Sequence, residues 1–154
     1  MFKFRYCIAF DERAMPCYLI PFALRTSGFN GSEQGSDSAP IIFIDYTIID
    51  VRDVAKEFAV QHLDVQTLGL KESLEKIERS VPVDSVLVTN GINAVRQVLH
   101  PQALRSSLKL TQLYCTFINA ARLKSFSYNS TSECTLQQEL TAISNAVRVA
   151  QKDL

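Results

Sequence analysis

Apolar and polar residues alternate along the first part of the chain. Residues 2–10 place apolar side chains on every second position, which is the period of a β-strand with one buried face. A second extended apolar run covers residues 16–24. It contains Pro21, which cannot donate a ladder hydrogen bond, so we expect this strand at a sheet edge or beside a bulge. Residues 41–49 are apolar on both faces apart from Asp45 and one threonine, which predicts a central strand.

The rest of the chain has mainly helical periodicity. Apolar residues spaced by three and four predict helices over residues 51–62, 70–79, 92–99, 101–124 and 135–152. A short β-branched run before the third of these helices predicts a fourth strand, and a proline ends the second helix.

The predicted order of elements is β-β-β-α-α-β-α-α-α, without an internal repeat. Three strands before the helices indicate the α+β class, with a small, mostly antiparallel sheet of three to four strands packed on one face by about five helices. We expect a single globular domain over residues 1–154. A mobile loop is expected at about residues 25–40, where three of the five glycines and four serines fall.

The composition is that of an ordinary globular protein. The chain has 154 residues, of which 47% are hydrophobic and 21% charged, and the 16 basic and 16 acidic residues give a formal net charge of zero. Such a balance argues against nucleic acid and anionic membranes as partners, because both are bound through excess positive charge. The sequence has neither a signal-peptide pattern nor an apolar run of about 20 residues, so we expect a soluble cytoplasmic protein.

Charge is nevertheless uneven along the chain. Residues 41–90 hold five basic and nine acidic residues, a balance of −4, whereas residues 91–154 hold seven basic and three acidic residues, a balance of +4. Unlike charges on two parts of one molecule favour pairing between copies. Five of these seven basic residues could instead bind nucleic acid, a hypothesis that we rank below the others; the five are Arg96, Arg105, Lys109, Arg122 and Lys124.

Three aspartates are the best candidates for chemistry. Asp45, Asp50 and Asp53 follow one another at the end of the third predicted strand, and carboxylates there could hold Mg²⁺ or Mn²⁺. Helix capping explains Asp50 and Asp53 without a metal, since both stand at a predicted helix start. Capping does not explain Asp45, which must be exposed, paired with a base such as Lys3 or Arg5, or functional.

Other recognised motifs are absent. The glycines fit no phosphate-binding loop and no Gly-x-Ser-x-Gly sequence occurs. His62 at a helix end and His100 before a proline suit surface or capping positions. Asn90-Gly91 reads as a turn, although the helix that follows could seat an anion there.

These observations favour a binding or protein-interaction module that self-associates, with a protein or itself as partner and no cofactor. The first alternative is a small enzyme that depends on Mg²⁺ or Mn²⁺ and acts on a phosphate-containing substrate through the three aspartates. The second alternative is a small-ligand-binding protein with a pocket between sheet and helices, lined by Tyr6, Phe43 and Tyr46 and gated by the loop at 25–40.

Overall fold

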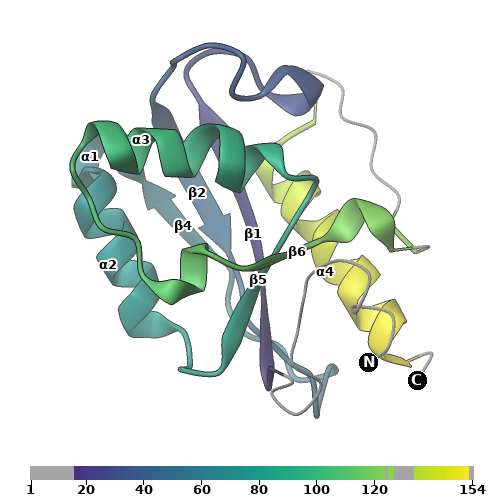
Figure 1. Cartoon of the computed structure of the whole chain (residues 1–154). Coiled ribbons are helices and arrows are strands. Elements are labelled where there is room, and N and C mark those ends of the chain that lie inside the picture. Colours follow the sequence, from purple (N-terminus) through teal and green to yellow (C-terminus); the bar gives the residue numbers. More distant parts are fainter. Residues whose placement is uncertain (1–15, 124, 127–133, 153–154) are drawn as a thin grey trace.

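Strand β1 (Tyr18–Thr26) lies in the middle of a mixed sheet (Figure 1). It pairs antiparallel with β2 (Ile41–Tyr46) and with the two-residue strand β3 (Ile49–Asp50). Strand β2 in turn pairs antiparallel with β4 (Gln61–Asp64). The computed structural model describes residues 16–123, 125–126 and 134–152.

The other half of the sheet is parallel. β1 pairs with β5 (Ser85–Thr89), and β5 pairs with β6 (Phe117–Asn119). The sheet order is β4-β2-β1-β5-β6, with β3 beside β1. Parallel neighbours need long crossover connections. The connection to β5 contains α1 (Val65–Leu68) and α2 (Leu70–Ser80).

The connection from β5 to β6 contains three further helical segments. They are η3 (Asn93–Leu99), α3 (His100–Arg105) and η4 (Gln112–Tyr114). After β6 come η5 (Ala120–Arg122) and the long α4 (Leu136–Lys152). Among the described residues, no helix is long and apolar enough to cross a membrane.

Helices cover both faces of the sheet. One core joins alternate residues of β1, namely Ile20, Phe22 and Leu24, to α2, η3 and η4. The second core joins Leu19 and Ala23 to α4, and Figure 1 shows α4 on the face opposite α2 and α3. The α+β class is confirmed. The sheet is mixed rather than mostly antiparallel, because the chain crosses over twice to make parallel pairs. It has six strands instead of the expected three to four, and helices cover both of its faces instead of one.

Pro21 lies in the central strand and not at a sheet edge, but β1 has a register shift between Arg25 and Thr26, in line with the alternative of a bulge. Its carbonyl accepts a hydrogen bond from Thr47 N at 3.2 Å, so its nitrogen faces the same side of β1. The ladder is interrupted there, since β2 ends at Tyr46 and β3 begins at Ile49. Pro21 therefore lies beside the gap between β2 and β3, where its lack of an N–H costs no hydrogen bond of the sheet.

Two helices form as predicted. α2 buries Leu74 and Ile77. Before α4, Thr135 N donates to Gln138 Oε1 at 2.8 Å and Gln138 N donates to Thr135 Oγ1 at 3.1 Å, which confirms the capping box. α4 buries the whole predicted apolar stripe, which consists of Leu136, Leu140, Ile143, Val147 and Ala150.

Two predicted helices are wrong. The helix expected over residues 101–124 ends at Arg105, because Ser107 adopts a left-handed conformation (φ 55°) and turns the chain. The helix expected over 51–62 does not form. Asp50 Oδ1 accepts from Arg52 N at 2.9 Å in a tight turn, and the segment ends in the edge strand β4. The strand expected over residues 2–10 lies outside the described residues.

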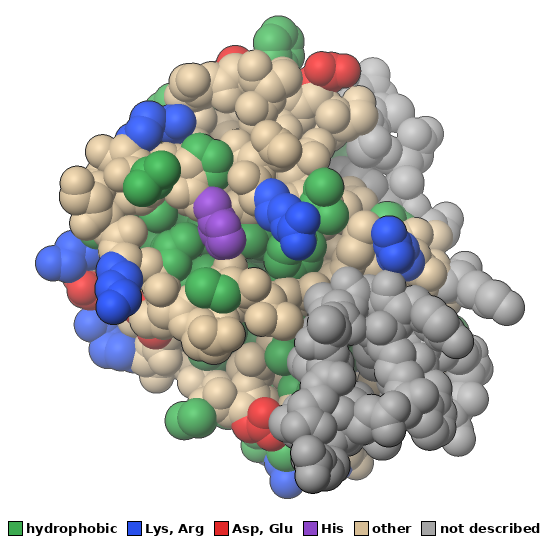
Figure 2. Space-filling model, viewed as in Figure 1, with side chains coloured by type: hydrophobic (Ala, Val, Ile, Leu, Met, Phe, Trp, Pro, Cys, Tyr) green, Lys and Arg blue, Asp and Glu red, His purple; other side chains and the backbone are tan. Residues whose placement is uncertain are grey.

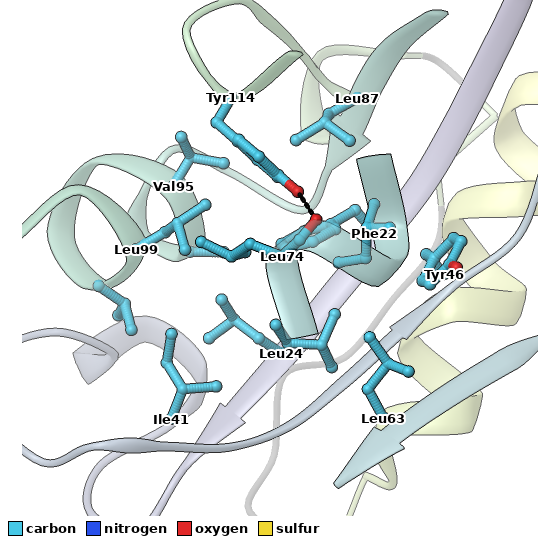
Figure 3. Packing of buried hydrophobic residues seen from close by; sticks show 14 of the residues in the cluster. Phe22, Leu24, Ile41, Tyr46, Leu63, Leu74, Leu87, Val95, Leu99 and Tyr114 are labelled. Atoms are coloured by element: carbon cyan, nitrogen blue, oxygen red, sulfur yellow. Dashed lines mark hydrogen bonds between the residues drawn. The ribbon is translucent and has the colours of Figure 1, made fainter. Parts of the chain in front are cut away.

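Tyr114 ties η4 to α2 through the first core (Figure 3). Its ring is fully buried and its hydroxyl donates to Leu74 O at 2.9 Å. Burial, with smaller contributions from Glu78 and Tyr46, raises the pKa of the Tyr114 phenol well above its ordinary value of 10.0.

This burial makes stability depend on pH in the alkaline range. Above pH 10.0, the ordinary phenol pKa, Tyr114 ionises in the unfolded chain but stays protonated in the folded one. The free energy of unfolding should therefore fall as the pH rises, by about 1.4 kcal/mol per pH unit for this group. Tyr114→Phe should remove that slope in urea unfolding between about pH 9 and 11, at a cost of about 1 kcal/mol at neutral pH. An unchanged alkaline slope in the variant would contradict this assignment.

Candidate functional site

The three parallel strands end at one edge of the sheet. β1 ends at Thr26, β5 at Thr89 and β6 at Asn119, and in open α/β sheets ligands bind in the crevice outside such carboxyl ends. A cavity of about 410 Å³ lies at this edge, within the size range of small-ligand sites. We call it the crevice; it is lined by Gly31, Ser32, Gln34, Asn90, Gly91, Ile92, Asn93, Asn119, Arg122 and Glu139.

Glu139 is the central charged group of the crevice. It lies in the first turn of α4, where the helix dipole favours a carboxylate, and is 8% exposed. One of its oxygens forms an ion pair with the Arg25 guanidinium from β1, and the other accepts from Asn90 Nδ2 at 3.3 Å. The Arg25 guanidinium also donates to Leu24 O at 3.2 Å and Cys134 O at 3.3 Å. β1, β5 and α4 are thus joined at this point.

Two amide side chains fix the backbone around the crevice. Asn119 Oδ1 accepts from Gly91 N at 3.0 Å and from Ala121 N at 2.9 Å, which joins the ends of β5 and β6. Gln34 Nε2 donates to Leu24 O at 3.0 Å and to Asn30 Oδ1 at 3.1 Å. The turn after β1, which holds η2 (Gly31–Glu33), is thereby attached to the strand. The polar lining is held in place before any ligand arrives.

A larger cavity, of about 580 Å³, lies at the opposite end of β5. Its lining includes Val83, Val86 and Leu113, and Glu78 is the single charged residue among the residues that line it. The lining of this larger cavity is more apolar than that of the crevice, and it lies at the amino end of β5, so we take the crevice as the candidate site.

The structure disperses the three aspartates. Asp45, on β2, is 4% exposed and hydrogen-bonded to the imidazole of His62 on β4, which faces it across the strands. Asp50 forms an ion pair with Arg52 at 3.1 Å, and the hydrogen bonds and charge of Arg52 lower the pKa of Asp50. Asp53 forms a backbone bridge with Asp50. Among the described residues no group of three or more His, Cys, Asp and Glu side chains is placed to hold a metal ion.

The predicted aromatic pocket does not assemble from the residues that the structure describes. Phe43 packs on the α4 side of the sheet and against the His62 ring, with ring centroids 5.0 Å apart. Tyr46 belongs to the opposite core, where its hydroxyl is hydrogen-bonded to Ser80 Oγ at 2.5 Å. Three positions along a strand place two side chains on opposite faces. Tyr6 lies outside the described residues.

His62 and His100 both have structural partners. His62 belongs to β4 rather than to a helix end, and its partner is Asp45. His100 Nε2 donates to Tyr114 O at 2.7 Å. Asp45 thus has a hydrogen-bond partner in His62. Lys3 and Arg5, the partners expected from the sequence, lie outside the described residues.

Sequence reasoning missed most of the crevice. In the sequence, Glu139 has the ordinary explanation of an acidic residue that stabilises a helix start. Arg25 has the ordinary explanation of a solvent-exposed residue at the end of a strand. Asn90-Gly91 carried a signal, as a turn that could seat an anion, and Arg122 was among the basic residues considered for nucleic acid.

Comparison by sequence finds no family model that matches the chain and no curated protein that matches it. Solved structures do match. A full-length 3′-exonuclease is similar over 90% of this chain and 83% of its own, with a TM-score of 0.64 and 12% identity. The nuclease domain of 3′hExo, a DEDDh family member bound to rAMP, is similar over 90% of this chain and 93% of its own, with a TM-score of 0.65 and 11% identity. This chain shares its fold with these two structures.

A third match concerns recognition of RNA. The structure of a 3′-exonuclease in 3′-end-specific recognition of a histone mRNA stem-loop is similar over 90% of this chain and 64% of its own, with a TM-score of 0.59 and 14% identity.

These matches correct three expectations from the sequence. The fold is shared with nucleases, so the hypothesis of a self-associating protein-interaction module is wrong. The exclusion of nucleic acid as a partner is wrong as well, because one match is described with an mRNA stem-loop. The expectation of no cofactor is contradicted too, since nucleases commonly act through divalent cations held by carboxylates.

The crevice can be tested for its fit to such cations. Glu139 is the single carboxylate among the residues that line it, and Arg25 and Asn90 contact both of its oxygens. A pair of catalytic cations requires several carboxylate oxygens that are available for coordination. The described part of the crevice therefore does not fit a two-cation centre.

The partner of Asp45 generates a stability prediction. His62→Ala leaves a buried carboxylate without its hydrogen bond and should lower the free energy of unfolding by roughly 1–3 kcal/mol. Asp45→Asn keeps a group that can hydrogen-bond to His62 and should cost less. Gln61→Ala, at the exposed neighbouring position of β4, is the matched control in urea unfolding. Equal effects of His62→Ala and Gln61→Ala would show that the pair contributes nothing.

Proposed function

We propose that this protein binds the end of a single-stranded nucleic acid in the crevice between β1, β5, β6 and α4. The observation that carries the proposal is the position of the crevice. It is a preformed polar cavity at the carboxyl ends of three parallel strands, in a fold similar to a nuclease domain bound to rAMP.

The chemistry of the lining suits one nucleotide. Amides such as those of Asn90 and Asn119 can hydrogen-bond to sugar hydroxyls and base edges. Arg122 supplies the charge for a phosphate, which a planar guanidinium binds through two hydrogen bonds. Glu139 accepts hydrogen bonds only and repels a second anion, so the phosphate belongs on the Arg122 side of the crevice.

Hydrolysis of the bound strand is a second candidate function. It is favoured by the fold itself, since each of the three structures described above is a 3′-exonuclease or its nuclease domain. Among the described residues that line the crevice, Glu139 is the single carboxylate that could take part in hydrolysis. We therefore derive no catalytic step.

Binding can be measured with two probes, AMP and a 5′-fluorescein-labelled single-stranded RNA of about 10 nucleotides. The protein should bind both, and Arg122→Gln should weaken binding of the RNA about tenfold, because a charge-assisted contact of about 1.4 kcal/mol is lost. The matched control is Arg79→Gln, which removes an arginine paired with Glu72 on α2. If neither probe binds, or if the two variants behave alike, the proposed site is wrong.

The same RNA separates binding from hydrolysis. In millimolar Mg²⁺ or Mn²⁺, hydrolysis from the 3′ end should shorten the strand stepwise on a denaturing gel. Glu139→Gln should abolish the shortening if this carboxylate takes part, while Arg79→Gln should leave it unchanged. RNA that binds but keeps its full length with both metals would remove the second candidate and leave the first intact.

A further inference from the structure

Charge is strongly segregated around the crevice. The sequence from Ser85 to Ser132 contains no aspartate or glutamate and five basic residues. This stretch supplies β5, η3, α3, β6 and η5, and so one rim of the crevice. A second rim is the turn over residues 27–40, which contacts η3 through the hydrogen bond from Asn93 Nδ2 to Ser32 O at 3.4 Å and carries Glu33 and Asp37 and no lysine or arginine. A phosphate chain that leaves the crevice is attracted by the first rim and repelled by the second.

The basic rim is a visible feature of the surface. In Figure 2, which looks onto η3, α3 and β6 as in Figure 1, basic side chains and a histidine lie across the middle of this face. The acidic side chains in the same view lie toward its periphery. A strand could therefore cross this face without passing a carboxylate.

Arg96 is the basic residue best placed beside the crevice. It is exposed on η3, with its guanidinium over the ring of Phe117 at 5.7 Å from the centroid. Within the described chain it forms no ion pair. Phe117 precedes the crevice residue Asn119 by two positions on β6, which is roughly 7 Å along a strand. The Arg96 guanidinium, which packs on the Phe117 ring, therefore lies about the length of one nucleotide from the crevice.

We propose that Arg96 binds the next phosphate of a single strand whose end occupies the crevice, so that the strand leaves over β6 and η3. This inference rests on the proposed function, because it extends the same site by one nucleotide. The ligand class is single-stranded RNA or DNA longer than one nucleotide. Arg96 contributes a sequence-independent phosphate contact, which strengthens binding without selecting bases.

The competing route is over the turn between β1 and β2. Phe29 is 60% exposed there, and its backbone is fixed, since its N–H donates to Asp37 Oδ2 at 3.0 Å and its carbonyl accepts from Thr26 Oγ1 at 3.1 Å. A base could stack on such a ring. The acidic residues beside it oppose the phosphates, which is why we favour the Arg96 route.

The test compares Arg96→Gln, Arg96→Lys, Phe29→Ala and the control Arg79→Gln, using AMP and the labelled single-stranded RNA at several salt concentrations. Arg96→Gln should weaken RNA binding about five- to tenfold and lower the slope of log Kd against log[salt] by about 0.7, the value for one phosphate contact on a single strand. It should leave AMP binding unchanged, because AMP has no second phosphate group. Arg96→Lys should keep the salt slope, since it keeps the charge.

The outcomes separate the two proposals. If RNA binds and Arg96→Gln matches Arg79→Gln in affinity and salt slope, the Arg96 contact is wrong while the crevice stands. If Phe29→Ala weakens RNA binding and Arg96→Gln does not, the strand leaves over the turn and the inference is overturned. If the unmodified protein binds neither probe, the crevice itself is wrong, and the inference is wrong with it.

Discussion

The fold depends on a single strand that is buried on both faces. Alternate residues of β1 enter two separate hydrophobic cores, one beneath α2 and η3 and one beneath α4. Both cores contain residues of β1, so a helical layer packs against each face of this strand. The same strand carries Arg25 near its end, beside the crevice. Folding and site formation are therefore imposed by one element.

The sequence was informative where a periodic stripe coincided with end signals. α4 has an apolar stripe with a period of 3.6 residues and a reciprocal cap between Thr135 and Gln138, and both are present in the structure. The segment after Pro101 has the stripe but not the stop signal. The helix ends because Ser107 adopts a left-handed backbone conformation. A glycine at that position would have predicted this conformation, but a serine does not. Ile118, which falls inside the helix expected over residues 101–124, is instead buried in β6 beside Val88.

Contacts between polar side chains were harder to predict, because they join residues that are far apart in the sequence. Asp45 and His62 are 17 positions apart and meet only because β4 forms where a helix was expected. Arg25 and Glu139 are 114 positions apart. A net charge of zero also concealed the acid-free stretch from Ser85 to Ser132. The net charge does not show how charged residues are distributed over the surface, whereas ligand binding depends on whether the residues beside a cavity are acidic or basic.

The attachment of Glu139 to α4 has a wider consequence. The helix is held against the sheet by its apolar stripe, and that packing brings the carboxylate in its first turn to its partners Arg25 and Asn90. A change of volume in the buried stripe, for instance at Ile143, would displace a charged group about one turn away, although it touches no ligand. Selection on the interior of this layer and selection on the recognition surface therefore act on the same residues, and neither property can be altered without regard to the other.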